Sequence, residues 1–213
     1  MSDAPATEPC DKQKAEQPDG ATAALVLSDG TVFWGKGIGI ENTVVGEICF
    51  NTSMTGYQEI LTDPSYKSQI VTMTYPEIGN YGVNPKDIES YQPHVSGFVV
   101  RELSPVMSSW RARQSLGDYL KQNGIPGIEG IDTRALTKKL RVRGAMNGLI
   151  STEDISDEEA KKQAAEWPGM VGADYVKEVT HSAAFDWDEH DQSNKIFTLP
   201  VGAQSEPSPA ELP

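Results

Sequence analysis

The fold class is decided by residues 44–75, which read VVGEICFNTSMTGYQEILTDPSYKSQIVTMTY. The first eight, 44–51, predict a strand with Ile48 and Phe50 on one face, because strand side chains alternate between two faces. QIVTMTY at 69–75 predicts a second strand. A helical pattern connects these strands, so the sequence predicts an α/β domain.

The connection predicts a short helix and a turn. Thr55 and Gln58 have the spacing of a capping box, in which each side chain binds a backbone N–H of the other residue. The proline of the following DPSY turn, 63–66, prevents the helix from continuing much past Thr62. The turn predicts an outward-facing hydroxyl and backbone amide at Ser65. From these residues alone, an ordinary loop is favoured over a ligand site.

Before this stretch, two apolar runs predict a hairpin. They are AALVLS at 23–28 and TVFWGK at 31–36, separated by Asp29-Gly30, a dipeptide that favours a two-residue type I′ turn. Residues 1–20 contain no branched aliphatic or aromatic side chain, which predicts a disordered acidic tail.

After residue 75 the pattern alternates loop, strands and helices. Residues 76–94 are rich in Pro, Gly, Asn and Asp and predict a long loop of a functional kind. VSGFVVRE at 95–102 is apolar on both faces and predicts a central strand, and shorter strands are expected at 125–131 and 145–150.

Three further helices each have a capping residue before them and a glycine or proline after them. They are expected at 110–123 after Ser109, at 133–143 after Asp132, and between Ser156 and Pro168. Residues 21–180 therefore predict one mixed α/β domain, and the Pro-rich segment 181–213 predicts a linker toward a further domain.

Charge and hydropathy exclude several functions. The 213 residues carry 31 Asp and Glu against 18 Lys and Arg, a net charge of −13, of which residues 1–20 and 181–213 contribute −8. This balance argues against a nucleic-acid partner, whose phosphates require dense Lys and Arg. No apolar run approaches the roughly 18–20 residues of a membrane span, and no signal peptide precedes the domain, so a cytoplasmic protein without a membrane partner is expected.

The thiol and imidazole side chains predict no catalytic or metal centre. Cys49 lies within an apolar strand, which favours a core thiol over a nucleophile, and Cys10 lies in the polar tail. The three histidines, His94, His181 and His190, are too far apart for metal-ligand spacing.

Two other patterns could in principle form binding sites. The glycines of GKGIGIENTVVG, residues 35–46, precede no helix and so predict a turn instead of a phosphate loop. The helix expected at 133–143 is basic, and a solvated face is favoured there over a protein-binding face. Its cationic residues are Arg134, Lys138, Lys139, Arg141 and Arg143.

Three long motifs resemble one family in the family's own order. They are FNTSMTGYQEILTDPSY at 50–66, IVTMTYPEIGNYG at 70–82 and GIEGIDTRALTKKLRVRGAMNG at 127–148. These motifs resemble the N-terminal domain of the small subunit of glutamine-hydrolysing carbamoyl-phosphate synthase. The resemblance extends from about residue 23 to the Pro-rich end.

The resemblance implies a swivelling β/β/α domain of three layers, with mixed sheets and three to four helices. It also implies a glutaminase domain that follows in the same polypeptide. That subunit would deliver ammonia to a large subunit, which holds ATP and Mg and makes carbamoyl phosphate for pyrimidine and arginine synthesis. Glutamine would contact Ser65 of the DPSY motif, and no cofactor would bind this chain.

The chain departs from the complete subunit in one respect. The family places its thiol nucleophile in a Gly-x-Cys-x-Gly elbow and its base in a His-Pro-Glu run, and neither string occurs here. The 213 residues are therefore expected to be inactive alone, as the amino-terminal part of an amidotransferase subunit. The alternative is a free-standing interaction module that kept the fold without the reaction and binds a protein through its basic helix.

Overall fold

The computed structural model describes residues 17–153 and 155–180. The elements up to residue 175 are β1 (Ala23–Leu27), β2 (Val32–Gly39), β3 (Thr43–Asn51), α1 (Tyr57–Thr62), the 3-10 helix η1 (Pro64–Tyr66), β4 (Gln69–Met73), β5 (Glu77–Ile78), β6 (Gly97–Val99), β7 (Glu102–Leu103), α2 (Leu116–Gln122), β8 (Pro126–Glu129), α3 (Thr133–Arg143), β9 (Met146–Ser151) and α4 (Asp157–Glu166). A second compact unit begins at residue 176 and contains α5 (Val176–Val179).

Seven strands form a closed barrel in the order β1-β2-β8-β6-β4-β3-β9, and β9 pairs with β1 to close it. The pairs β3–β4, β4–β6 and β6–β8 are parallel, and the other four are antiparallel. β5 and β7 form a separate two-stranded sheet. The expected mixed α/β class is confirmed, whereas the three-layer arrangement is not. The described residues also contain five α-helices instead of three to four.

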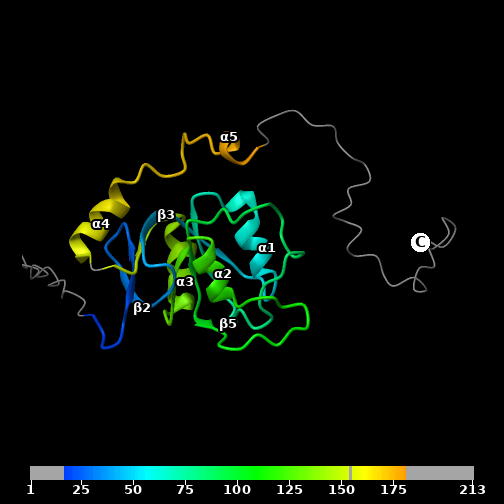
Figure 1. Cartoon of the computed structure of the whole chain (residues 1–213). Helices are drawn as coiled ribbons and strands as arrows, with labels where there is room; N and C mark the ends of the chain where they lie inside the picture. Colours follow the sequence, from blue (N-terminus) through cyan, green and yellow to red (C-terminus); the bar gives the residue numbers. More distant parts are fainter. Residues whose placement is uncertain (1–16, 154, 181–213) are drawn as a thin grey trace, which may run out of the picture. The chain divides into compact units, whose positions relative to one another are not determined.

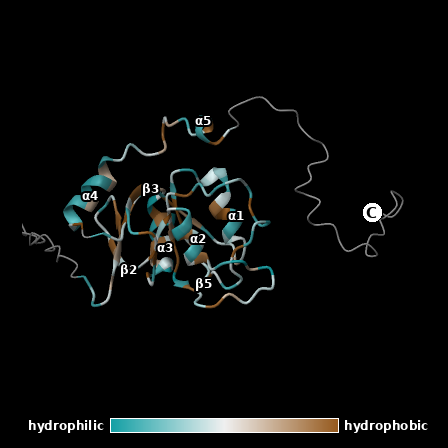
Figure 2. Ribbon diagram, viewed as in Figure 1, coloured by the Kyte–Doolittle hydropathy of each residue, from teal (hydrophilic) through white to brown (hydrophobic). Residues whose placement is uncertain are grey.

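Alternate side chains of the strands pack into different clusters. Leu25 of β1 and Ile70 of β4 pack with α3 residues, while Val71 of β4 packs against α1 and α2. Val26 of β1 faces Ala160 of α4. Helices therefore cover the barrel on more than one side, with α4 and α1 on opposite sides (Figure 1). In Figure 2 the hydrophobic colour lies mainly in the strands, and α4 is hydrophilic on its outer side.

The opening hairpin is confirmed, but its turn differs from the expected type. Gly30 N–H donates to the Leu27 carbonyl, and Leu27 N–H donates to the Thr31 carbonyl, both at 2.8 Å. The loop therefore has three residues, 28–30, of which only Gly30 has a positive φ, 84°. A type I′ turn would need positive φ at two residues, so the two-residue prediction is wrong.

Two of the three capped helices match their predicted ranges. α3 begins after Asp132, whose side chain accepts from Ala135 N–H, and α4 begins after Ser156, whose side chain accepts from Glu159 N–H. The helix expected from residue 110 begins instead at Leu116, after Ser115. Backbone bonds from Arg113 and Gln114 to Val83 hold the preceding residues out of the helix.

The predicted central strand at 95–102 is shorter than expected. Only Gly97–Val99 lies in the barrel, where β6 is between β4 and β8. The chain then bends so that Glu102 and Leu103 pair with β5 in the other sheet. The strands expected near 44–51, 125–131 and 145–150 are present, and the strand expected at 69–75 ends at Met73.

Gly39 allows β2 to approach the chain just before β8. Its φ is +78°, and a Cβ at this position would overlap the Ile125 carbonyl oxygen. We expect Gly39→Ala to lower the free energy of unfolding by about 3 kcal/mol, from the left-handed backbone and the overpacking together.

Gly124→Ala is the matched control, because Gly124 also has a positive φ, 71°, but has open space around its Cβ position. It should cost about 1 kcal/mol in urea denaturation. Equal losses for both variants would show that the close approach at Gly39 contributes nothing.

Candidate functional site

The DPSY turn is a rigid structure that leaves one hydroxyl exposed. Asp63 Oδ1 accepts from Ser65 N–H at 2.8 Å, and Tyr66 N–H donates to the Asp63 carbonyl at 3.1 Å. Ser65 is exposed, and its hydroxyl makes no hydrogen bond within residues 17–153 and 155–180. The hydroxyl thus faces outward as predicted, whereas the amide does not, because Asp63 already binds it.

Tyr66 fixes this turn to the end of β3. Its hydroxyl accepts a 3.0 Å hydrogen bond from Asn51 Nδ2, and its ring packs against the buried cluster of α1 and α2. Asn51 is the last residue of β3, and its Oδ1 accepts from Ser53 N–H at 2.8 Å. The same asparagine therefore connects the Ser65 turn with the exposed segment 52–55.

The N-terminus of α1 is capped by a tyrosine from the 76–94 loop. The predicted capping box does not form, since the N-cap residue is Gly56, with a φ of 84° and no side-chain cap. Tyr81 Oη instead accepts from Gly56 N–H at 2.6 Å and from Tyr57 N–H at 3.3 Å. The rings of Tyr57 and Tyr81 stack with centroids 4.2 Å apart, and burial raises the pKa of both phenols.

Because the capping box does not form, the Gln58 side chain hydrogen-bonds instead to the backbone of the 76–94 loop. Its Nε2 donates to the Asn84 carbonyl at 2.5 Å, and its Oε1 accepts from Asn84 N–H at 2.9 Å. At the other end of α1, Thr62 Oγ1 accepts from Glu89 N–H at 2.9 Å. The 76–94 loop is thus bound along the length of α1.

Glu59 and Asp87 place acidic groups beside this helix. Glu59 Oε2 is buried with no hydrogen-bond partner in the described chain. Burial raises the pKa of Glu59, and the charges of Asp87 and Glu89 raise it further. Asp87 forms an ion pair with Arg111, which joins the loop to the segment before α2.

His94 closes the 76–94 loop and is buried. Ser90 Oγ lies 2.6 Å from the Thr62 carbonyl, to which it donates, and 3.0 Å from His94 Nε2. The buried Nδ1 of His94 has no hydrogen-bond partner among the described residues. Burial is the main cause that lowers the pKa of His94, with the charge of Lys67 acting in the same direction.

Cys49 is poorly suited to nucleophilic chemistry. Burial and the charge of Glu47 raise its pKa to about 12, so the thiol is protonated at neutral pH. Cys49 is half-buried at the edge of the core, whereas the sequence predicted a core position. No group of three or more potential metal ligands occurs in the described part of the chain. Cys10, His181 and His190 lie outside it.

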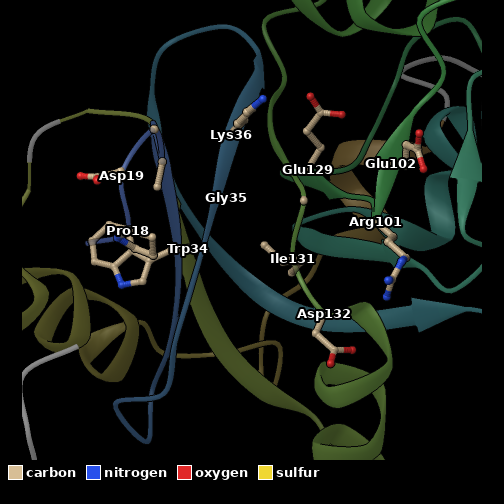
Figure 3. A pocket seen from close by; sticks show the side chains of 13 residues that line it. Pro18, Asp19, Trp34, Gly35, Lys36, Arg101, Glu102, Glu129, Ile131 and Asp132 are labelled. Carbon is tan, nitrogen blue, oxygen red and sulfur yellow. The ribbon is translucent and has the colours of Figure 1, made fainter. Parts of the chain in front are cut away.

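Three cavities lie away from Ser65. One of about 610 Å³ is lined by β2, β8 and the start of α3 (Figure 3). A second, of about 290 Å³, is lined by the 83–93 segment and α2. A third, of about 360 Å³, is lined by β1, Trp34 and residues 151–153.

The glycines of 35–46 lie inside strands, three in β2 and Gly46 in β3, so the predicted turn is limited to residues 40–42. No helix follows them, as predicted. No described helix is long and apolar enough to cross a membrane.

Ser65 as a glutamine contact stays a prediction, and sequence reasoning missed the residues that support its surroundings. Tyr81 and Asn84 lie more than 20 residues from the α1 groups that they bind. Their positions between glycines and prolines marked the loop as such, but no local pattern specified their partners.

Comparison with known proteins identifies relatives of this chain. A family model described as the carbamoyl-phosphate synthase small chain, CPSase domain, matches residues 25–150. The carbamoyl phosphate synthase small chain of Syntrophotalea carbinolica is 57% identical over 167 residues, which are 78% of this chain and 44% of that relative. That of Nostoc sp. is 54% identical over 171 residues, which are 80% of this chain and 44% of that relative.

The chain therefore spans less than half the length of these two curated relatives. Among solved structures, an aminopeptidase from Aneurinibacillus sp. strain AM-1 has a TM-score of 0.33 at 13% identity, covering 63% of this chain and 31% of that one. This likeness is too low to inform the fold.

Replacing Tyr81 by Phe should destabilise the domain by about 1–2 kcal/mol, because it leaves two amides at the N-terminus of α1 without an acceptor. Hydrogen exchange should accelerate at the amides of Gly56 and Tyr57. The control is Tyr119→Phe, since the Tyr119 hydroxyl makes no hydrogen bond within the described residues. A cost for Tyr119→Phe equal to that for Tyr81→Phe would refute the capping role.

His94 should make stability depend on pH. Because its folded pKa is lowered from 6.5, the unfolded chain binds more protons between the folded pKa and 6.5. The free energy of unfolding should therefore fall as pH falls through this range, and be fully recovered above 6.5. Urea denaturation of the wild type and of His94→Gln should show a weaker dependence in the variant. Parallel curves would assign the dependence to other groups.

Proposed function

Because the chain belongs to the carbamoyl-phosphate synthase small-chain family, we propose that it is the N-terminal part of the small subunit of glutamine-hydrolysing carbamoyl-phosphate synthase. The complete subunit would hydrolyse glutamine and deliver ammonia to a large subunit. The large subunit would use bicarbonate and ATP with Mg to form carbamoyl phosphate, for pyrimidine and arginine synthesis in the cytoplasm. This chain would supply structure and coupling to that reaction.

The observation that carries the proposal is the unpaired hydroxyl of Ser65 on a rigid turn. Asp63 holds the backbone of the turn, and Tyr66 ties it to Asn51 at the end of β3. Because the backbone of the turn is already held in this way, only the rotation of the Ser65 side chain is lost when its hydroxyl binds a polar substrate such as glutamine. Ser65 would form one wall of a glutamine site, with the remaining wall on the C-terminal half of the subunit.

The chemical step would belong to that C-terminal half. Glutamine hydrolysis by this family requires an activated thiol paired with a base. Cys49 has a raised pKa and its Sγ bonds only Gln69 Oε1, at 3.6 Å, among the described residues. The chain by itself would therefore release no ammonia from glutamine.

The alternative, a free-standing interaction module, rests on the cationic surface of α3. Reading the coding sequence beyond Pro213 separates the two possibilities. An in-frame continuation into a Gly-x-Cys-x-Gly elbow supports the amidotransferase subunit, whereas a stop codon supports the module.

In a complete small subunit bound to its large subunit, Ser65→Ala should raise the KM for glutamine several-fold. Ammonia-dependent carbamoyl phosphate synthesis should change much less, because ammonia bypasses the glutamine site. Ser28→Ala, in the turn between β1 and β2, is the control and should change neither rate. Equal losses with both nitrogen sources would point to a folding or assembly defect instead of a glutamine contact.

A further inference from the structure

α3 presents a cationic face to solvent. Arg134, Lys138 and Arg141 are exposed and lie on one side of the helix, because residues four and seven positions apart are in line. The opposite side carries Leu136 and Leu140, which are buried in the barrel cluster. We call the three cationic residues together with Val142 the α3 cationic face.

Some of the positive charge on α3 has an ordinary structural explanation. Lys139 forms a 2.7 Å ion pair with Asp29 in the hairpin turn. Arg141 and Arg143 lie in the last turn, where a cation interacts favourably with the negative end of the helix dipole. These three residues would stabilise the helix without any partner.

Arg134 has no such explanation. It is the second residue of α3, where the helix dipole is positive and disfavours a cation. It is also four residues before Lys138, a spacing at which like charges repel. Neither Arg134 nor Lys138 forms an ion pair within the described chain. Their charges therefore oppose helix stability.

Val142 adds an apolar contact to the same face, since it is 84% exposed. Beyond the N-terminal end of α3, the 610 Å³ cavity holds a further exposed cation, Arg101, whose side chain extends toward the first turn (Figure 3). The same cavity is also lined by Lys36 and by four carboxylates, of which Asp132 lies at the start of α3; the others are Asp19, Glu102 and Glu129. The lining of this cavity therefore carries both signs of charge, and the cationic face is confined to α3 itself.

We infer that the α3 cationic face docks on an acidic protein surface, with Val142 in an apolar contact at the C-terminal end of this face. An acidic partner would neutralise the repulsion between Arg134 and Lys138, and it would steer encounter toward this face of an otherwise negative chain. A nucleic acid fits less well, because a net charge of −13 repels it. If the chain has the function proposed above, this partner is the large subunit.

The test measures binding of the purified large subunit to this chain by biolayer interferometry at low and at physiological salt. The triple variant Arg134→Glu, Lys138→Glu, Arg141→Glu should bind at least about tenfold more weakly, with a smaller salt dependence. Val142→Ser should weaken binding at both salt concentrations. Arg134→Glu alone should weaken binding while it raises the urea midpoint, because a carboxylate suits the start of a helix.

The control is Lys86→Glu, Lys121→Glu, Lys162→Glu, which makes the same change in net charge at three exposed lysines on other elements. The control should retain wild-type affinity. Equal weakening by both triple variants would overturn the inference and indicate a general charge effect.

Three further outcomes separate this inference from the proposed function. Binding by the wild type that the α3 variants do not weaken would refute only the docking surface. Failure of the wild type to bind the large subunit at all would refute the identification of the large subunit as the partner. Steeply salt-dependent binding of duplex DNA that is lost in the α3 triple variant would overturn the choice of a protein partner.

Discussion

The parallel pairing of β3 with β4 is the constraint on which the rest of the structure depends. Glu47 lies opposite Gln69, and Asn51 opposite Met73. Parallel neighbours cannot be joined by a tight turn, so residues 52–68 have to leave the barrel after β3 and return before β4. α1 lies in this crossover, followed by the DPSY turn. The exposed position of Ser65 therefore follows from the strand topology.

A second dependence links this crossover to the 76–94 loop. α1 has only six residues, too few for a helix that is stable on its own, and its N-cap provides no side-chain acceptor. The loop provides Tyr81 at one end of α1 and Asn84 beside it, and its residue 89 bonds Thr62 at the other end. The loop thus has a structural function in holding the helix that precedes Ser65.

The sequence predicts an element of this fold well where the contacts that fix its ends are local in sequence. Asp132 and Ser156 bind amides three residues away, so the starts of α3 and α4 were readable from sequence. The start of α2 was not, because Val83 binds the backbone before it from about 30 residues away. The capping role of Tyr81 also had no sequence signal, because it too depends on a distant contact. Barrel closure could not be predicted from the alternation of apolar residues along the strands. The prediction of a substrate contact at Ser65 rests on the family motif, since its residues alone favoured an ordinary loop.

A comparison of α3 with α4 distinguishes charges that stabilise their own helix from charges that do not and that a partner protein could bind. The first turn of α4 carries Asp157 and its two acidic neighbours, which suit the positive end of the dipole, so its charge pattern is explained within the helix. α3 follows the same rule at its last turn and violates it at Arg134. Both helices have a capping residue and a buried apolar side, so packing does not distinguish them. A charge that weakens its own helix and has no ion-pair partner in the described domain is one whose cost an acidic second protein would offset.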